Sequence, residues 1–466
     1  MKKMFKVVAL MLTLVMAVSM LAGCGASVND KNENGQTVIS VGRWPTKEGP
    51  ELDAMNARKE RFEAANPDVY VEPDKWEFDR RTFYAKAAGN QLPTVYYAGF
   101  TEMPEIISSE MSADITSVLK KRGYEGMINP AVLANITDED GAIKTFPMMA
   151  YVLGLVFNAK ILKQAGYLAE DGTPHQPATL DELVEMAVQI KEKTGKVGLV
   201  LPTAEGAGGW IFTTIAWAFG VDFMEKDENG KWHATFNTPE AAAALQWYKD
   251  LKWKYDVLPA NTMINTEEWN RSMGSGNAGL TINSGDVSGK LLKFGLAPED
   301  LGMMVMPAGP KRHVVLLGGS VQCLRNDATE DQIDAGVRWL ETANSYKLTE
   351  EYKKTTEDTI ATYLEQNRHV GIHGMSVWST ESESVKWYND YIDAHTNGNP
   401  NHVKLYNEFV LNPTCDIQPE EPVCCQQLYA ILGNCIQEVI LNENADCAAI
   451  MEKANADFQR DYLDTM

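Results

Sequence analysis

The sequence predicts an α/β protein made of two bodies, and three observations carry that prediction. Short strand patterns alternate with helical patterns along the chain, which is typical of a parallel sheet covered by helices on both faces. The chain has 466 residues, more than a single hydrophobic core usually supports. Hydrophobic residues make up 44% and charged residues 23%, as in an ordinary folded soluble protein.

Residues 1–23 have the pattern of a signal peptide. Three lysines precede an apolar run over residues 7–23, and small residues end it. The run of about 17 residues is at the lower limit for a membrane-spanning helix, which is the alternative interpretation. Leu-Ala-Gly-Cys at residues 21–24 resembles the lipobox of bacterial lipoproteins. This resemblance implies that Cys24 becomes the first residue and that acyl chains, palmitate among them, anchor it stably to a membrane.

Residues 24–37 are small and polar and show no periodicity, so we expect a flexible tether between the anchor and the folded part. The formal charge is −22, and it becomes −25 once the three lysines of the leader are removed. So acidic a surface repels nucleic acid and anionic lipid. We therefore expect neither as a partner, and attachment to a membrane has to come from the lipid.

Three segments after the tether alternate as strands do: residues 37–43, 68–72 and 94–100. The first is followed by a helical pattern over residues 51–67, with Leu52, Met55 and Phe62 on one face. Pro67 marks the stop before the second strand. A further helical segment separates the second strand from the third. These elements predict a parallel sheet.

A second α/β body follows in the sequence. Residues 144–166 read as an apolar strand that leads into a short helix. The next helix has Thr179 as its N-cap, Glu182 three residues later as a capping box, and Gly195 at its end. Residues 236–255 predict another helix, with a threonine cap and a proline in the first turn.

Motifs of catalysis are missing from the sequence. It contains no Gly-x-Ser-x-Gly elbow, Gly-x-Gly-x-x-Gly loop, Walker loop or His-Glu-x-x-His pair. His369 and His373 are four residues apart, but neighbouring glycines argue against a helix that would bring them together on a metal. We expect no metal and no cofactor. The sequence has so many acidic residues that it neither singles out nor excludes a pair of glycosidase carboxylates.

Aromatic residues near expected loops are the candidate ligand contacts. A planar ring can lie against the apolar face of a sugar while carboxylates and amides bind its hydroxyls. Core packing is the competing explanation and accounts for about half of such rings, with Trp217 expected on a buried helix. The rings considered are Trp44, Phe100, Tyr151, Trp210, Trp217, Trp269 and Trp378.

Six cysteines follow Cys24, and their spacing matches no zinc site. An exported chain permits disulfides, and six cysteines allow fifteen pairings. Buried, unpaired thiols in an organism that lives without oxygen are the alternative. The six are Cys323, Cys415, Cys424, Cys425, Cys435 and Cys447.

Five sequence blocks resemble the family 1 extracellular solute-binding proteins, the maltose-binding-protein-like receptors of ABC importers. They include "ERFEAANPDVYVE" and "FPMMAYVLGLVFNAKILKQAG", and they stand in the order of the family. Together they cover most of the chain between residues 38 and 340. The blocks are residues 60–72, 146–166, 177–190, 273–291 and 306–320.

The resemblance implies a two-lobed periplasmic-binding-protein-like fold, with a ligand cleft between the lobes and several hinge crossings. The first lobe would comprise residues 38–148 and 324–375, and the second residues 149–323 and 376–466. Thr94 and Asp286 depart from the aspartate and tryptophan that the family often has, which leaves the ligand open. The binding residues implied are Arg43, Trp44, Phe100, Thr101, Glu102, Tyr151, Trp210 in a glycine-rich loop, Asp286 and Gly319.

The function implied is a monomeric receptor, lipid-anchored at the extracellular face of the cell membrane. It would close around a sugar or oligosaccharide and deliver it to the permease subunits of an ABC importer, without catalysis. Two alternatives stay open. The first is a secreted carbohydrate-active hydrolase, which would need two carboxylates facing one ligand atom, and the second is a receptor for a solute that is not a sugar.

Overall fold

The computed structural model describes residues 30–466. The expected signal peptide, Cys24 and the first part of the expected tether lie outside these residues. The last part of the tether, from Asp30, is folded against the first strand. The Asn32 side chain accepts hydrogen bonds from the backbone N–H groups of Asn34 and Gln36, both at 3.0 Å. The free tether predicted for residues 24–37 is therefore too long, because an asparagine-centred turn orders its end.

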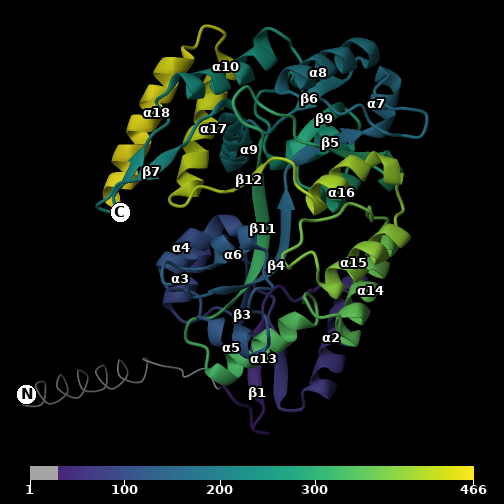
Figure 1. Cartoon of the computed structure of the whole chain (residues 1–466), viewed down its shortest axis with the longest axis vertical. Coiled ribbons are helices and arrows are strands. Elements are labelled where there is room, and N and C mark those ends of the chain that lie inside the picture. Colours follow the sequence, from purple (N-terminus) through teal and green to yellow (C-terminus); the bar gives the residue numbers. More distant parts are fainter. Residues whose placement is uncertain (1–29) are drawn as a thin grey trace, which may run out of the picture.

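The first lobe contains most of a six-stranded sheet with the strand order β12, β11, β3, β1, β2 and with β4 beside β11. Figure 1 shows β4, β11 and β12 at the junction of the two lobes. Strand β1 pairs in parallel with both β2 and β3, as predicted. Its alternate residues are buried, because one face of the strand packs against the core. The strands are β1 (Thr37–Val41), β2 (Val69–Pro73), β3 (Val95–Gly99), β4 (Thr145–Val152), β11 (Val314–Leu324) and β12 (Asp416–Pro419).

Helices cover this sheet, and α13 packs on β1 while α14 packs on α2. Helix α2 ends at Ala65, just before Pro67, so the predicted stop is confirmed. The helices of this lobe are α2 (Pro50–Ala65), α3 (Arg80–Ala88), α4 (Met103–Ser108), α5 (Thr116–Lys121), α6 (Pro130–Ile136), α13 (Glu330–Glu341), α14 (Glu350–Glu365) and α15 (Glu383–Ala394).

The second lobe has a four-stranded sheet with the order β10, β5, β9, β6, and a separate β7–β8 hairpin. The sheet consists of β5 (Gly154–Asn158), β6 (Val197–Val200), β9 (Ala278–Asn283) and β10 (Leu301–Val305). The hairpin consists of β7 (Met224–Lys226) and β8 (Trp232–Ala234). All residues of β9 are buried, so this strand is covered on both of its faces.

Helix α8 of the second lobe begins and ends where the sequence predicts. The Thr179 hydroxyl caps α8 by accepting from the N–H of Glu182 at 3.2 Å, and Gly195 ends it in the left-handed conformation. The helices are α7 (Ala159–Ala165), α8 (Leu180–Thr194), α9 (Glu205–Phe219), α10 (Pro239–Trp253), α11 (Thr266–Gly274), α12 (Ser288–Leu292), α16 (Lys404–Leu411), α17 (Cys425–Leu441) and α18 (Cys447–Asp461).

Strands β4 and β11 connect the lobes and pair with each other in antiparallel orientation (Figure 1). The sheets are therefore mixed, whereas the sequence predicted parallel sheets. Strand β11 runs antiparallel to β3, and β5 runs antiparallel to both β9 and β10. The single apolar strand predicted within residues 144–166 is two strands, because the chain leaves β11 at Leu153 and joins the second sheet.

The chain passes between the lobes a third time after α15. Tyr388 and Ile392 of α15 pack with Ile360 of α14 in a small apolar cluster of their own. Helix α16, by contrast, packs on β10 of the second lobe. The sequence analysis predicts this passage earlier, after Met375. The other two lobe boundaries that it predicts fall inside β4 and β11. The exact lobe boundaries stay predictions.

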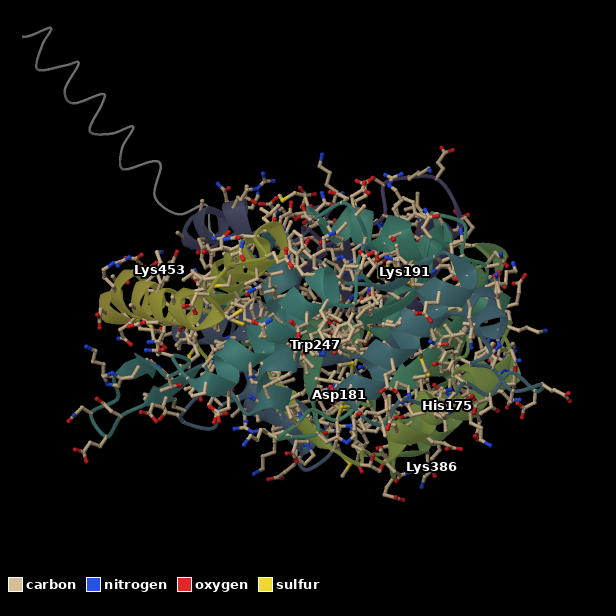
Figure 2. All side chains as sticks on the ribbon, turned by 90° about the horizontal axis from the view of Figure 1, so that it is seen from above. His175, Asp181, Lys191, Trp247, Lys386 and Lys453 are labelled. Atoms are coloured by element: carbon tan, nitrogen blue, oxygen red, sulfur yellow. The ribbon has the colours of Figure 1, made fainter. Side chains whose placement is uncertain are left out.

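Charged side chains lie outside and large apolar ones inside, as in any folded protein. Lys386 and Lys453 lie at the periphery, and Trp247 of α10 lies within (Figure 2). All six cysteines of the described chain are free, which agrees with the thiol alternative rather than with disulfides. Among the described helices, none combines the length and the apolar character that crossing a membrane requires.

Candidate functional site

The first lobe contributes a short helical turn, η1 (Phe100–Glu102), directly after β3. The side chains of Thr101 and Glu102 are half-buried there, and Glu102 forms an ion pair with Arg80 of α3. Phe100 is buried beneath the turn. A Cβ atom on Gly319 would lie 2.7 Å from the Phe100 ring, so glycine is needed at this contact. Three candidate residues thus lie at one end of a strand.

Arg43 and Tyr97 lie beside this turn. The Arg43 backbone is in the left-handed region, with φ of 58°, and its guanidinium carbon lies 4.2 Å from the centre of the Tyr97 ring. Burial raises the pKa of Tyr97, while the charge of Arg43 lowers it and the charges of Glu102 and Asp286 raise it. Because Asp286 belongs to the second lobe, Tyr97 lies where the two lobes face each other. The sequence analysis did not single out Tyr97.

Tyr151 of β4 lies between the two lobes. Its ring packs directly on Gly318 of β11, where any Cβ atom would collide with it. Burial raises the pKa of Tyr151 well above its ordinary value, and the charges of Asp286, Glu420 and Glu102 raise it further. Tyr151 therefore faces carboxylates from both lobes.

The second lobe contributes Asp286 and Trp210. Asp286 lies on the turn η2 (Gly285–Val287) after β9, is exposed, and accepts a hydrogen bond from the Ser284 hydroxyl. Trp210 lies on helix α9, so the predicted glycine-rich loop is wrong. Gly209 permits the helix to pack closely on α17, because a Cβ atom there would collide with the backbone carbonyl of Tyr429.

Glu420 is a half-buried residue between the lobes whose Oε2 atom is buried without a hydrogen-bond partner, and the sequence analysis missed it. Burial raises its pKa to about 7, while the polar groups of Thr101, Trp210 and Tyr429 nearby lower it and the charge of Glu102 raises it. Glu420 thus joins candidate residues of both lobes. Its sequence signal is weak: two adjacent glutamates between two prolines, a segment that cannot continue as a helix.

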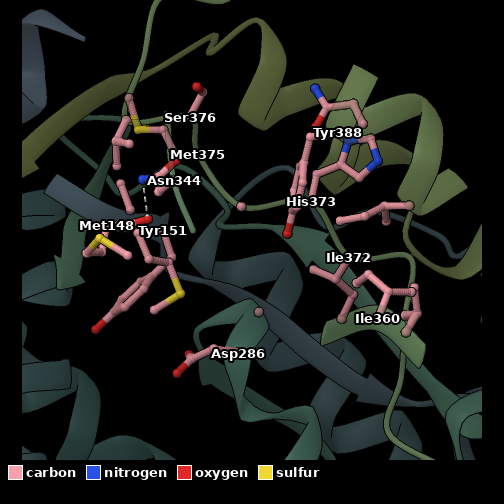
Figure 3. A pocket seen from close by; sticks show the side chains of 18 of the residues that line it. Met148, Tyr151, Asp286, Asn344, Ile360, Ile372, His373, Met375, Ser376 and Tyr388 are labelled. Atoms are coloured by element: carbon pink, nitrogen blue, oxygen red, sulfur yellow. Dashed lines mark hydrogen bonds between the residues drawn. The ribbon is translucent and has the colours of Figure 1, made fainter. Parts of the chain in front are cut away.

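A pocket of about 290 Å³ lies beside Tyr151 and Asp286, between β4, η2, α14 and α15 (Figure 3). Figure 3 shows Tyr151 and Asp286 on one side and Ile360 and Tyr388 on the other. Its walls are mostly apolar, with a few polar side chains, as in pockets for small molecules. The polar ones include Asn344, Arg368, His373, Tyr388 and Asn389.

Trp44 lies away from these residues, in the core of the first lobe. Its ring is 6% exposed and stacks on Trp339 with 6.1 Å between the ring centres. Little of the ring is left for a ligand, so the structure differs here from the expectation. Of the seven rings considered, those that keep partial exposure are Tyr151 and Trp210. Trp217 is fully buried, as predicted, and donates a hydrogen bond to Glu421 at 2.9 Å.

His369 and His373 are both buried and lie on an irregular segment between α14 and α15. His373 Nε2 lies 2.8 Å from Asp393 Oδ1. Burial lowers the pKa of His369 to about 4, and the nearby His402 lowers it further. Within residues 30–466, no cluster of three or more histidine, cysteine or acidic residues could hold a metal ion.

Two lobes joined by crossing strands, with facing aromatic rings and carboxylates between them, form an arrangement suited to holding a small ligand between the lobes. Residues 46–342 match the family model of the bacterial extracellular solute-binding proteins. The chain belongs to this family.

Relatives of known sequence are distant. Escherichia coli (strain K12) YcjN, named as an ABC transporter periplasmic-binding protein, is 25% identical over 312 residues, which are 62% of this chain and 65% of YcjN. The sn-glycerol-3-phosphate-binding periplasmic protein UgpB of the same organism is 24% identical over 64% of this chain and 68% of UgpB. The match to YcjN thus spans slightly less than two thirds of its length.

Solved structures show the same fold over nearly the whole chain. Maltose-bound MalE3 of T. maritima has a TM-score of 0.67 and 21% identity, over 91% of this chain and 99% of that one. UgpB of Mycobacterium tuberculosis in complex with glycerophosphocholine has a TM-score of 0.65 and 15% identity, over 91% and 98%. Both are two-lobed binding proteins in fold.

Proposed function

We propose that this protein is a lipid-anchored receptor that captures a sugar or oligosaccharide between its lobes and delivers it to the permease of an ABC importer. The observation that carries the proposal is the convergence of Tyr97, Tyr151 and Trp210 with carboxylates from both lobes. Rings of this kind can lie against sugar faces, and carboxylates accept hydrogen bonds from hydroxyls. The maltose-bound structural neighbour supports the same ligand class, and the family supports solute binding in general.

The binding residues we propose are those that surround the cleft. Residues on both lobes are required, because a ligand drives closure only if it binds the closed form more tightly than the open one. The set retains eight residues of the sequence analysis, replaces Trp44 with Tyr97 and adds Glu420. It comprises Arg43, Tyr97, Phe100, Thr101, Glu102, Tyr151, Trp210, Asp286, Gly319 and Glu420.

A calorimetric and thermal-shift screen against a panel of sugars and oligosaccharides tests the proposal. A cognate sugar at about a hundred times its dissociation constant should stabilise the protein by roughly 2.7 kcal/mol. It should be recovered chemically unchanged. Turnover would instead favour the hydrolase, and binding of polyol phosphates with no sugar bound would favour the receptor for another solute, as the UgpB relative suggests.

Membrane attachment has its own test. Cys24→Ser removes the residue that the lipobox would acylate, so the variant should appear in the soluble or secreted fraction while its melting temperature stays at the parental value. Fractionation of cells that express the parent and the variant measures this. A variant that stays with the membrane as the parent does would exclude lipid anchoring through Cys24.

A further inference from the structure

Arg368 has a guanidinium group without a partner at the pocket between η2, α14 and α15. No hydrogen bond or ion pair joins this group to another of the described residues, and its Nε atom is buried without a partner. One face of the group lies on the Tyr363 ring, 3.8 Å from the ring centre. Stacking of this kind leaves the N–H groups free to donate.

This state of Arg368 is unusual for the chain. The net charge is −22, so carboxylates are plentiful. Arg58 donates hydrogen bonds to Thr342 and to the carbonyl of Trp339. Apart from Arg43, which lies over Tyr97, the remaining arginines of the described chain pair with carboxylates: Arg61, Arg80, Arg81, Arg122, Arg271, Arg312, Arg325, Arg338 and Arg460. Within residues 30–466, the two unpaired guanidinium groups both belong to the region between the lobes.

Arg368 also lies against the second lobe. A Cβ atom on Gly289 of α12 would lie 2.9 Å from its Nε atom, so the glycine makes room for the guanidinium group. Asp286 precedes Gly289 by three residues and lines the same pocket, yet it forms no ion pair with Arg368. Both residues line the pocket, so one ligand can contact both.

The balance of charge around the cleft permits an anion. Glu102 is paired with Arg80. Burial raises the pKa of Glu420 to about 7, so this carboxyl group takes up a proton more readily than an ordinary glutamate does. Asp286 is thus the carboxylate that opposes Arg43 and Arg368. The many acidic residues on the outer surface are screened beyond about 8 Å at physiological salt.

We infer that the ligand is a polyhydroxylated anion whose charged group, a carboxylate or a phosphate, binds the guanidinium of Arg368 while its hydroxyls face Asp286 and Tyr151. Arginine presents a planar fork of donors that matches both anions. The inference rests on the proposed function and narrows it from sugars in general to sugars that carry a carboxylate or a phosphate.

The experiment compares matched neutral and acidic probes by calorimetry. Glucose, galactose and maltose are measured against glucuronic acid, galacturonic acid, digalacturonate and glucose 6-phosphate. We expect tighter binding of an acidic probe, weakened by rising sodium chloride. If the carboxylate probes bind and the phosphate probe does not, the ligand is a sugar acid. If only the phosphate probe binds, the ligand is a phosphate ester.

Variants then assign the anion to Arg368. Arg368→Gln should weaken binding of the acidic probe by about ten- to a hundredfold, and Arg368→Lys should restore part of the loss because it keeps the charge without the fork. Arg312→Gln, which removes an arginine paired on the outer surface of the second lobe, should leave the affinity unchanged. Melting of each variant without probe identifies any loss of fold.

Two results would overturn the inference in distinguishable ways. A neutral sugar could bind at least as tightly as every acidic probe, and Arg368→Gln could bind it like the parent. In that case the proposal of a sugar receptor stands, and the inference of an anionic ligand is wrong. If no probe of either kind binds, the proposed function fails together with the inference. An acidic probe that binds equally to the parent and to both Arg368 variants would also exclude Arg368 as the contact.

Discussion

Trp44 and Trp210 show that two tryptophans in similar sequence positions can have different roles. Both follow segments that end near the cleft, and both were candidate contacts. Trp44 turns inward and stacks on Trp339, whereas Trp210 keeps partial exposure and lies close to Glu420. Which way a ring turns depends on partners that are distant in the sequence, here at residue 339.

Replacement of these rings separates stability from binding. Trp44→Ala should lower the free energy of unfolding by about 3 to 5 kcal/mol, because it removes a packed aromatic ring from a core. Trp210→Ala should keep near-parental melting without ligand and lose about ten- to a hundredfold in affinity. Calorimetry and thermal melting measure both. If Trp210→Ala binds the cognate ligand like the parent, Trp210 is not part of the site.

Glu420 and Glu421 make stability depend on pH. Burial raises the pKa of each to about 7, above the ordinary value of 4.5. The folded state therefore holds more protons than the unfolded state between these values, and the free energy of unfolding falls as pH rises from about 4.5 to 7. A tenfold difference in proton affinity between the two states corresponds to about 1.4 kcal/mol, so the effect is about 3 kcal/mol per group.

The Glu420→Gln/Glu421→Gln variant provides the comparison, since glutamine stays neutral at every pH. Melting temperatures at pH 5, 6, 7 and 8 should fall more steeply for the parent than for the variant. His369 acts in the opposite sense, because its lowered pKa favours the folded state as pH rises from about 4 to 6.5. A parent and variant with parallel pH profiles would show that the two carboxyl groups do not titrate in this window.

Helices α9 and α17 pack closely because glycine lies at their contact. Gly209 faces the backbone of Tyr429, and Gly433 of α17 faces the carbonyl of Glu205, 2.7 Å from where its Cβ atom would lie. The contact fixes Trp210 and Tyr429 near Glu420. Glycine in a helix costs stability by itself, so its presence here follows from the packing.

Two glycines on the same helix give a matched pair of variants. Gly209→Ala should destabilise the protein strongly, by several kcal/mol, because the new methyl group collides with the backbone of α17. Gly206→Ala, whose Cβ atom would have no neighbour closer than 3.8 Å, should stabilise by about 0.5 to 1 kcal/mol. Denaturant unfolding measures both, and equal effects would contradict this packing.

Elements with local signals were predicted from the sequence, and elements decided by distant partners were not. The cap at Thr179, the end at Gly195 and the stop at Pro67 depend on neighbouring residues, and all three are confirmed. The break at Leu153 depends on which strand each half pairs with, and the helical state of the residues around Gly209 depends on α17. Glu420 was missed because its partners come from η1, α9 and α17.

At the scale of the whole molecule, direct contacts join the two lobes beside the cleft. Arg80 of the first lobe donates to Gln426 of α17 at 2.9 Å, and Lys226 of the second lobe pairs with Glu139 of the first at 3.0 Å. Neither contact requires a ligand. Each therefore favours the arrangement in which the lobes face each other.

Removal of one such contact should weaken binding without touching the ligand. Gln426→Ala should lower affinity about two- to tenfold, because part of the ligand's binding energy then has to hold the lobes together. Gln427→Ala is the matched control. Gln427 is next to Gln426 on the same helix and makes no hydrogen bond to the described part of the first lobe. Small-angle scattering should show a larger radius for Gln426→Ala without ligand, and identical scattering and affinity for both variants would contradict this role.

The three passages of the chain between the lobes also constrain how such a receptor can evolve and be engineered. The first lobe is assembled from β1 to α6 and from α13 to α15, while β5 to β10, α16, α17 and α18 form the second, and β4, β11 and β12 form the connection between them. Neither lobe is one continuous stretch, so a whole lobe cannot be exchanged between relatives by a single recombination event or produced as one fragment. We therefore expect new ligand preferences to arise through substitutions in the turns at the cleft, such as η1 and η2, while the two-lobed frame stays the same.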